Sequence, residues 1–168
     1  MQKSAVIVDH FWRYRLDRIW DLDGKGTVAF VMLNPSTANA EHDDATIRRC
    51  VGYAKTLGYG HLVVVNLYGY RATNPKDLLR QIAEDEGFAI GAGNDAHVLA
   101  ALQEANLVVA AWGANAPASR VEAMHCTFRA LRSTVFCLGW TRKRAPVHPL
   151  RQPREAPLSL YWQGDRLT

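Results

Sequence analysis

Three polar residues in this sequence stand where a small ligand could be bound: Asn34, Asn66 and His148. Asn34 and Asn66 each come directly after a run of apolar residues, and His148 lies in a late, basic stretch. An asparagine side chain presents a donor and an acceptor side by side, and a neutral histidine presents one of each near neutral pH. These groups can read the edge of a polar ring and stabilise charge that develops during a reaction.

The three residues together indicate a binding site more strongly than any one of them does. Ligands of open parallel sheets bind beyond the carboxyl ends of the strands, because loops and helix N-termini converge there and present free backbone donors. Taken singly, Asn34-Pro35 is also typical of a turn, Asn66 of an amide that satisfies its own turn, and His148 of a surface loop. All three at predicted strand ends favour one shared site.

A second cluster is acidic and precedes a predicted helix. His42, Asp43 and Asp44 carry ligand atoms that a hydrolytic metal ion could use. Adjacent aspartates at this place are more typical of a helix cap, which interacts favourably with the positive end of the helix. Asp44 and Arg48 are four residues apart and could pair on the helix, whereas Arg48 or Arg49 could instead reach a phosphate or a base.

Strand-sized apolar runs predict the sheet that would bring the candidate residues together. Residues 12–20 alternate as a half-buried strand does, and a turn at 21–26 leads into an apolar run at 27–33. This order predicts an antiparallel hairpin that feeds the sheet. Further runs are typical of strands covered on both faces, and they comprise residues 62–65, 107–111 and 134–138.

Helical spacing separates these strands. A helix over residues 47–57 has Asp43 or Asp44 placed to cap its start and Gly58 to end it, a second over 94–105 has Asn94 as its cap, and a third covers 121–131. The alternation predicts an α/β fold, namely a three-layer sandwich around a short parallel sheet of about four strands, with an N-terminal antiparallel strand.

Length and composition favour one domain over residues 1–168. We expect an N-terminal strand and turn in 1–26, a core in 27–139, and a basic loop and tail in 140–168. The 48% hydrophobic content is enough for a continuous core, and the apolar runs are far shorter than a membrane helix needs. Charged residues interrupt the N-terminus before any signal peptide could form, which predicts a cytoplasmic protein. The cysteines, which lack C-x-x-C spacing, are Cys50, Cys126 and Cys137.

The formal net charge of +4 is mild, so its distribution is more informative than its size. Residues 141–154 hold five basic residues and no acidic one, and this loop is either a solvated face or a surface for phosphates. After the loop, residues 159–162 are expected to pack against the body. The basic residues are Arg142, Lys143, Arg144, Arg151 and Arg154.

Several ungapped motifs, in order, resemble those of a family called domain of unknown function 1643. The likeness covers about residues 13–153, and the family name assigns no activity. The motifs are Met32-Leu33-Asn34-Pro35-Ser36-Thr37-Ala38, Asp43-Asp44-Ala45-Thr46-Ile47-Arg48-Arg49-Cys50, Val65-Asn66-Leu67, Tyr70-Arg71-Ala72-Thr73-Asn74-Pro75 and His148-Pro149-Leu150.

A more distant similarity links the same strand ends to the uracil-DNA glycosylase superfamily. Leu33-Asn34-Pro35-Ser36 resembles that superfamily's G-x-N-P-G motif, and Asn66 with residues 71–75 resembles the segment after its second core strand. Trp112-Gly113 matches a third strand end, and His148-Pro149-Leu150 stands where the superfamily has an H-P-S motif on a loop that enters DNA. The chain departs from these motifs at Met32, Ser36 and Leu150, where the superfamily has glycine, glycine and serine.

This resemblance implies a nucleobase pocket that hydrolyses an N-glycosidic bond in DNA or a nucleotide. Asn34 would position water, Asn66 would read the base edge, and His148 would donate a hydrogen bond to the departing base. If the substrate is a duplex, the target nucleotide would be flipped out of it into the pocket. No cofactor, metal, membrane or obligate protein partner is predicted. The alternatives are a non-catalytic nucleic-acid or nucleotide-binding module and a metal-dependent hydrolase. The basic loop is predicted to contact phosphates. Other predicted substrate contacts are Pro35, Ser36, Asp44, Arg48, Tyr68, Tyr70, Arg71 and Trp112.

Overall fold

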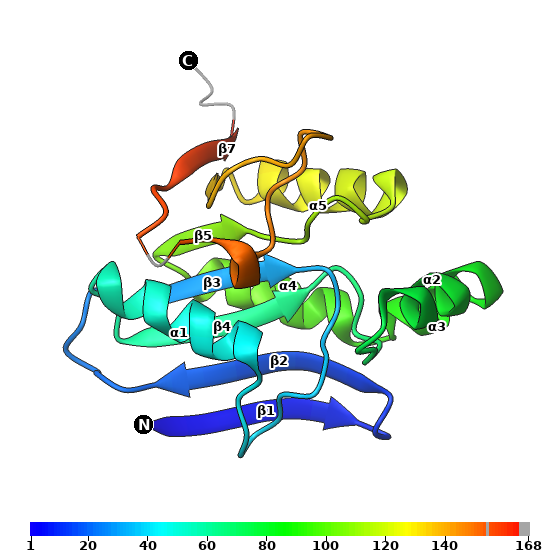
Figure 1. The fold of residues 1–168 in the computed structure, drawn as a ribbon, viewed down its shortest axis with the longest axis horizontal. Helices are drawn as coiled ribbons and strands as arrows, with labels where there is room; N and C mark the ends of the chain where they lie inside the picture. The colour runs from blue at the N-terminus through cyan, green and yellow to red at the C-terminus, as the bar shows by residue number, and fades with distance from the viewer. Residues whose placement is uncertain (154, 165–168) are drawn as a thin grey trace.

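A mixed seven-stranded sheet runs through the molecule, and the computed structural model describes residues 1–153 and 155–164 (Figure 1). The strand order is β1-β2-β4-β3-β5-β6-β7. The strands are β1 (Gln2–Val8), β2 (Trp12–Ile19), β3 (Thr27–Met32), β4 (His61–Asn66), β5 (Leu107–Ala110), β6 (Thr134–Cys137) and β7 (Ser159–Gln163).

The middle of the sheet is parallel and its edges are antiparallel. β3 pairs in parallel with β4 and β5, so that Val31 lies opposite both Val65 and Ala110, and β6 pairs in parallel with β5. β1 and β2 on one side, and β7 on the other, run antiparallel to their neighbours. The sheet is therefore larger and more mixed than the short parallel sheet of about four strands that the sequence predicts.

The predicted hairpin between residues 12–20 and 27–33 is wrong, because β4 lies between β2 and β3. The hairpin partner of β2 is β1, a strand that the sequence analysis does not predict. The connection is three residues long, from Asp9 to Phe11, and Asp9 and His10 both have positive φ, 47° and 61°, as tight hairpin connections often require. This turn sets the pairing of β1 with β2, and the longer 20–26 connection lets β3 enter beyond β4.

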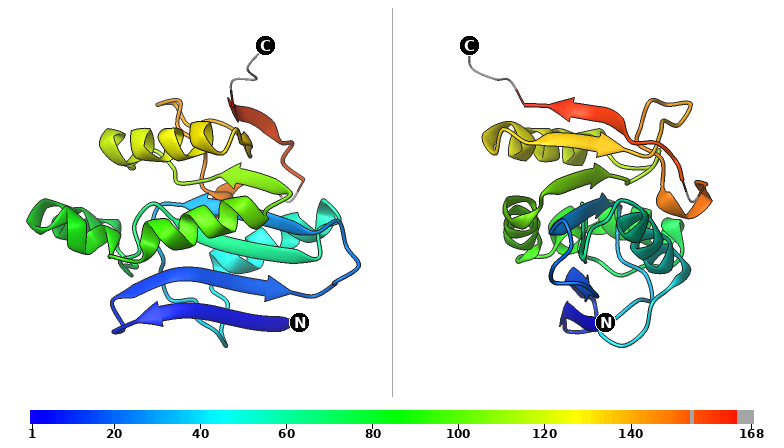
Figure 2. Two further views of the ribbon diagram at one scale, coloured as in Figure 1. Left: turned by 180° about the vertical axis from the view of Figure 1, so that it is seen from behind. Right: turned by 90° about the vertical axis from the view of Figure 1, so that its left-hand side faces the viewer.

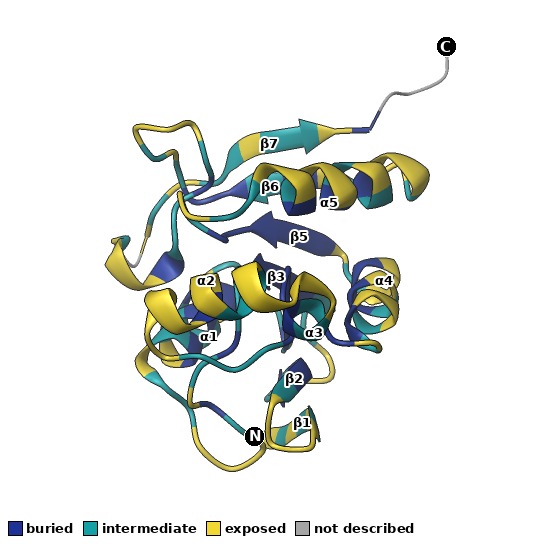
Figure 3. Cartoon of the chain, turned by 90° about the vertical axis from the view of Figure 1, so that its right-hand side faces the viewer, coloured by how far each residue is buried: buried dark blue, intermediate teal, exposed yellow. Residues whose placement is uncertain are grey.

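Helices cover both faces of the sheet and make three layers (Figure 2). α1 (Ala45–Thr56) packs on one face, where its buried residues Ile47 and Cys50 meet Phe30 and Val64. α4 (Asn94–Glu104) and α5 (Ala118–Ala130) pack on the other face. β3 and β5 are buried between the layers, as their dark blue ribbons show in Figure 3.

Two further helices are not predicted by the sequence analysis, which interprets residues 71–75 only as a strand-end motif. α2 (Pro75–Glu84) starts at Asn74, whose side chain accepts a hydrogen bond from the Lys76 N–H, with proline at the first helical position. α3 (Glu86–Ile90) follows at once and is capped by Asp85. Asn94 does not cap α4 as predicted, because its amide is buried and donates to the carbonyls of Asn66 and Leu67.

The connections that follow β3 and β4 cross opposite faces of the sheet, and this creates a crevice. The β3-to-β4 connection passes through α1 on one face, and the β4-to-β5 connection passes through α2, α3 and α4 on the other. Loops that diverge in this way leave a gap beyond the carboxyl ends of β3 and β5, the usual ligand site of open α/β sheets. Among the described helices, none combines the length and the apolar character needed to cross a bilayer.

Candidate active site at the strand ends

A pocket of about 720 Å³ lies at this crevice, a volume typical of small-molecule sites. Its walls come from the ends of β3 and β5, the first turn of α1, and the loop that carries the short helix η1 (Pro149–Arg151), which contacts α1. The residues that line it include Arg13, Met32, Asn34, Ser36, Asp44, Thr46, Ile47, Trp112, Gly113, Asn115, His148 and Arg151.

Asn34 follows β3, and its amide is held in one orientation. Nδ2 donates to the carbonyl oxygens of Ala72, at 2.8 Å, and of Pro35, at 3.0 Å. Both N–H groups are therefore engaged by backbone acceptors, and Oδ1 is left to accept a hydrogen bond. Since Asn34 lines the pocket, it presents an acceptor to a water molecule or ligand there.

His148 is held over Gly113 and lines the same pocket. Gly113, at φ +78°, turns the chain after β5 and its N–H donates to the Pro146 carbonyl, which pins the loop at that point. The Nδ1 atom of His148 accepts a hydrogen bond from the Leu150 N–H at 3.3 Å. Burial lowers the pKa of His148, although nearby Asp44 raises it, so the ring is neutral near pH 7 and its proton lies on Nε2.

Asp44 is the N-cap of α1 and faces the pocket as well. Its Oδ1 accepts from the Ile47 N–H at 2.9 Å, which confirms the predicted cap. The predicted pair between Asp44 and Arg48 is wrong, because the Arg48 guanidinium donates to the carbonyl oxygen of Asp43. The carboxylate of Asp44 is therefore available between Arg13 and His148, on both of which it acts electrostatically.

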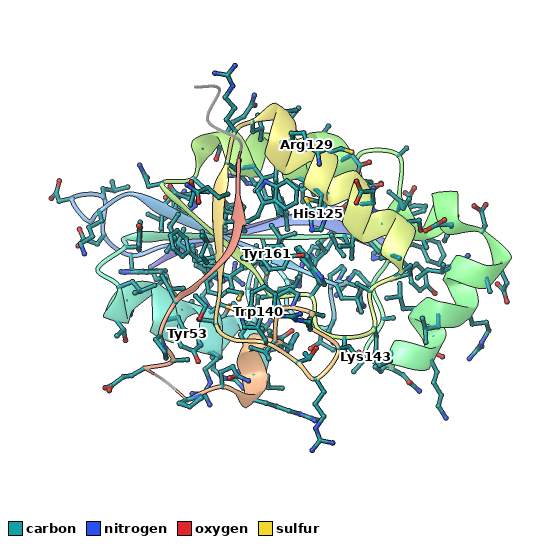
Figure 4. The ribbon with its side chains drawn as sticks, turned by 90° about the horizontal axis from the view of Figure 1, so that it is seen from above. Tyr53, His125, Arg129, Trp140, Lys143 and Tyr161 are labelled. Carbon is teal, nitrogen blue, oxygen red and sulfur yellow. The ribbon has the colours of Figure 1, made fainter. Side chains whose placement is uncertain are left out.

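The inner wall of the pocket is formed by side chains that are almost fully buried. Met32, Ile47 and Trp112 supply apolar surface there, each at most 4% exposed. The ring of Tyr161 meets Trp112 edge-on, with 5.2 Å between ring centroids. Tyr161 also stacks on Trp140, and both of these residues are labelled in Figure 4. A flat aromatic ligand could lie against this wall.

Arg13 also belongs to the inner wall, and the sequence analysis does not predict it as a site residue. It is 1% exposed, and Nη1 donates to the Ala38 carbonyl at 2.8 Å. Burial lowers the pKa of Arg13 to about 10, Asp44 opposes this shift, and Arg71 and Arg18 add to it. The guanidinium is still charged at neutral pH, so the pocket has a cationic end.

Asn66 is buried in the sheet and is not among the residues that line the pocket. Its side chain is fully buried, and neither Nδ2 nor Oδ1 has a hydrogen-bond partner among the described residues. Met32, its partner across the β3–β4 ladder, lines the pocket. The structure thus brings Asn34 and His148 together in one pocket lining, and Asn66 is buried outside that lining, next to Met32 in the sheet.

Several predicted contacts lie elsewhere. Tyr68 is buried on the α4 side, where its hydroxyl donates to Glu86 at 2.8 Å, and burial followed by that contact raises its pKa. Tyr70 packs toward Phe88, with 6.1 Å between ring centroids. Arg71 donates to the Ser36 carbonyl at 3.4 Å and lines a second, polar pocket. Tyr68 and Tyr70 are therefore outside the pocket lining, and Trp112 is the predicted aromatic residue that could stack on a ligand there. Pro35 is buried beneath the rim, and its carbonyl accepts from Asn34 and from the Ala72 N–H.

The basic residues of the loop lie in two different places, the pocket and the exposed surface. Arg151 lines the pocket, whereas Arg142, Lys143 and Arg144 are exposed on a turn of the loop, where Figure 4 labels Lys143. Arg154 lies outside the described residues. The loop therefore contributes one cation to the pocket and three to the surface near it.

The two aspartates of the predicted metal cluster make different contacts. Asp43 accepts from Arg18 Nε at 2.7 Å and lies 3.5 Å from Lys3, while Asp44 caps α1. His42 is exposed. Over residues 1–153 and 155–164, no group of three or more histidine, cysteine, aspartate or glutamate side chains is placed to hold a metal ion.

Comparison with known proteins gives one match. Residues 13–150 match the family described as "Protein of unknown function (DUF1643)". No curated protein and no solved structure matches the chain.

Proposed function

This chain belongs to the family described as "Protein of unknown function (DUF1643)", and we propose that its pocket binds a nucleobase-bearing ligand and hydrolyses the N-glycosidic bond of that ligand. The observation that carries the proposal is that Asn34 and His148 line one pocket with complementary free atoms, an acceptor on Asn34 and a donor on His148. The sequence resemblance to uracil-DNA glycosylases at the strand ends supports the same chemistry.

Hydrolysis of this bond separates charge. The departing base gains negative charge and the sugar carbon gains positive charge. Water then attacks that carbon, and the proton that the water loses ends on the released base. A neutral His148 can donate from Nε2 to the base as its charge develops, in a pocket where such a bond is stronger than in water. Asn34 Oδ1 can hold the water, because its amide cannot turn away from the two carbonyls that fix it.

Asp44 supplies the remaining charge. A carboxylate near the breaking bond stabilises a sugar that has oxocarbenium character, as carboxylates do in glycoside hydrolysis. Asp44 is held by the helix it caps, so its position costs no reorganisation during the reaction. Trp112 offers the base a rigid apolar surface at the β5 end of the pocket.

The test is release of free base from a panel of substrates, followed by chromatography. The panel holds nucleosides, nucleoside monophosphates, and DNA with uracil, hypoxanthine or mismatched bases. We expect product from at least one class and a loss of at least about 100-fold in rate for Asn34→Ala and for His148→Ala. His42→Ala removes an exposed histidine outside the pocket and serves as the matched control.

Two results would contradict this function. Binding of DNA with a steep salt dependence and no product from any substrate would favour the non-catalytic binding module, for which the exposed Arg142, Lys143 and Arg144 would be the contacts. Base release that survives both substitutions in folded variants would move the chemistry to another site.

A further inference from the structure

Arg13 differs from the other buried arginines of this protein. Arg18 and Arg120 are also buried, and each pairs with an aspartate: Arg18 with Asp43 and Arg120 with Asp95. Arg13 makes one side-chain hydrogen bond in the described part of the chain, to Ala38, and its Nε is buried without a partner. A buried guanidinium with five N–H donors is costly unless an anion pairs with it.

The first turn of α1 adds a second feature at the same end of the pocket. Ala45 and Thr46 open this 12-residue helix and line the pocket, so the first turn, whose leading backbone N–H groups have no intrahelical partners, borders the ligand space. The Asp44 side chain occupies the Ile47 N–H alone. A helix N-terminus carries partial positive charge and binds phosphate groups readily.

The charges around this end sum to a positive value despite Asp44. Arg151 also lines the pocket, and Arg71 lies close enough to act on Arg13 electrostatically. Arg18, the other cation that acts on Arg13, is paired with Asp43. Two arginines that line the pocket, Arg13 and Arg151, thus face one carboxylate before the helix terminus is counted, and an anion would balance the excess positive charge.

The strand order sets the distances between the parts of the pocket. Arg13 belongs to β2, Asn34 follows β3, and Trp112 follows β5. The strand order is β2-β4-β3-β5, so β4 lies between β2 and β3, and β5 is the neighbour of β3. With about 4.8 Å between neighbouring strands, Arg13 and Trp112 stand on the order of 14 Å apart, with Asn34 between them. A ligand along this line meets a cation first, then the water-holding amide, then an aromatic wall.

We propose that the β2 end of the pocket binds the phosphate of a nucleoside monophosphate, which makes a free nucleotide, rather than a base flipped from duplex DNA, the substrate of this site. The proposal rests on the proposed function for the base and the bond that breaks. Arg13 and α1 hold the phosphate, Asn34 faces the sugar, and Trp112 and His148 meet the base. A duplex keeps its phosphates at the rim, whereas Arg13 is 1% exposed and lines the inner wall, where a terminal phosphate would have to enter the pocket to meet it.

Titration calorimetry with nucleoside monophosphates and the matching nucleosides tests this assignment. We expect the wild-type protein to bind one monophosphate at least about tenfold more tightly than its nucleoside, since hydrogen bonds to a charged group are the stronger kind. Arg13→Gln should remove this difference, and Arg13→Lys should restore part of it. Arg80→Gln, which breaks an exposed pair with Asp77 on α2, is the matched control and should change nothing.

A measurement on the wild-type protein keeps the test decisive if Arg13 variants fail to fold. Inorganic phosphate should compete with the monophosphate and leave nucleoside binding unaffected. Equal affinity for nucleoside and monophosphate, or no competition by phosphate, overturns the phosphate assignment, while base release from nucleosides would still support the proposed function. Tight binding of monophosphates that depends on Arg13, without base release from any substrate, overturns the hydrolysis and leaves the phosphate site standing.

Discussion

At the scale of single residues, the protonation state of His148 decides whether it can donate. Its Nδ1 accepts from the Leu150 N–H, so we expect the neutral Nε2–H tautomer at pH 7. Burial lowers the pKa of His148, so the unfolded chain binds this proton more readily than the folded protein does. The free energy of unfolding should therefore fall as pH decreases below about 6.5, the ordinary histidine value, toward the lowered native pKa.

Nitrogen-15 spectra of the imidazoles across a pH titration check both statements. An Nδ1–H tautomer for His148, or a pKa above the ordinary histidine value, would contradict them and remove the proposed donor. His125 has a pKa lowered mainly by burial too, so unfolding curves of wild type and His148→Gln must be compared to isolate the contribution of His148. His125 is retained in both proteins and its effect cancels.

The sequence predicted part of the site but not its buried cation, Arg13. Asn34 and His148 could be found because each follows an apolar run or lies in a motif at a strand end. Regular alternation over residues 12–20 puts Arg13 and Arg15 on the same side of the strand, but the β1–β2 register shifts between Val6 and Ile7, which pair with Arg15 and Arg13. Across this irregularity Arg13 reaches Ala38 while Arg15 reaches Glu104 on α4, and simple alternation does not predict that difference.

At the scale of elements, the pocket depends on the loop from β3 to α1. A buried ion pair between Arg18 of β2 and Asp43 of this loop holds the loop against β2. Arg18 is fully buried and donates from Nε to Asp43. We expect Asp43→Asn to lower the free energy of unfolding by about 3 kcal/mol, because it leaves a buried charge without its counter-ion. Urea unfolding measures the effect.

Asp77→Asn is the matched control for that substitution. It removes an aspartate from an exposed pair with Arg80, and such pairs contribute less than about 1 kcal/mol. Similar losses for both variants would show that Arg18 draws enough support from the carbonyls of Ser4, Asp17 and Asn39 without Asp43. The loop would then be fixed by backbone contacts rather than by charge.

Elements with strong local signals were predictable, and those with competing interpretations were not. Apolar runs predict β3, β4, β5 and β6, and helical spacing with a capping aspartate predicts α1. α2 was missed although Asn74-Pro75 is a helix-start signal, because the same residues fit a strand-end motif. Strand neighbours could not be predicted at all, since pairing depends on contacts between distant segments.

At the scale of the whole molecule, stability should be highest in the middle of the sheet and lowest at its edges. β3 is buried between two cores, one on each face, and its neighbours β4 and β5 share both cores. β1 and β7 have one strand neighbour each, and Val6, Val8 and Leu160 are exposed on them. Fewer buried contacts make local opening easier at the edges.

Native-state hydrogen exchange tests this gradient. We expect the β3 and β4 amides to exchange only when the whole protein unfolds, and the β1 amides that face away from β2 to exchange by at least about tenfold faster local opening. Amides of β2 that bond to β4 provide the internal control, since they lie in the same hairpin but inside the sheet. Protection in β1 as strong as that in β3 would contradict an open edge, and its dependence on protein concentration would identify a second copy of the chain as the cover.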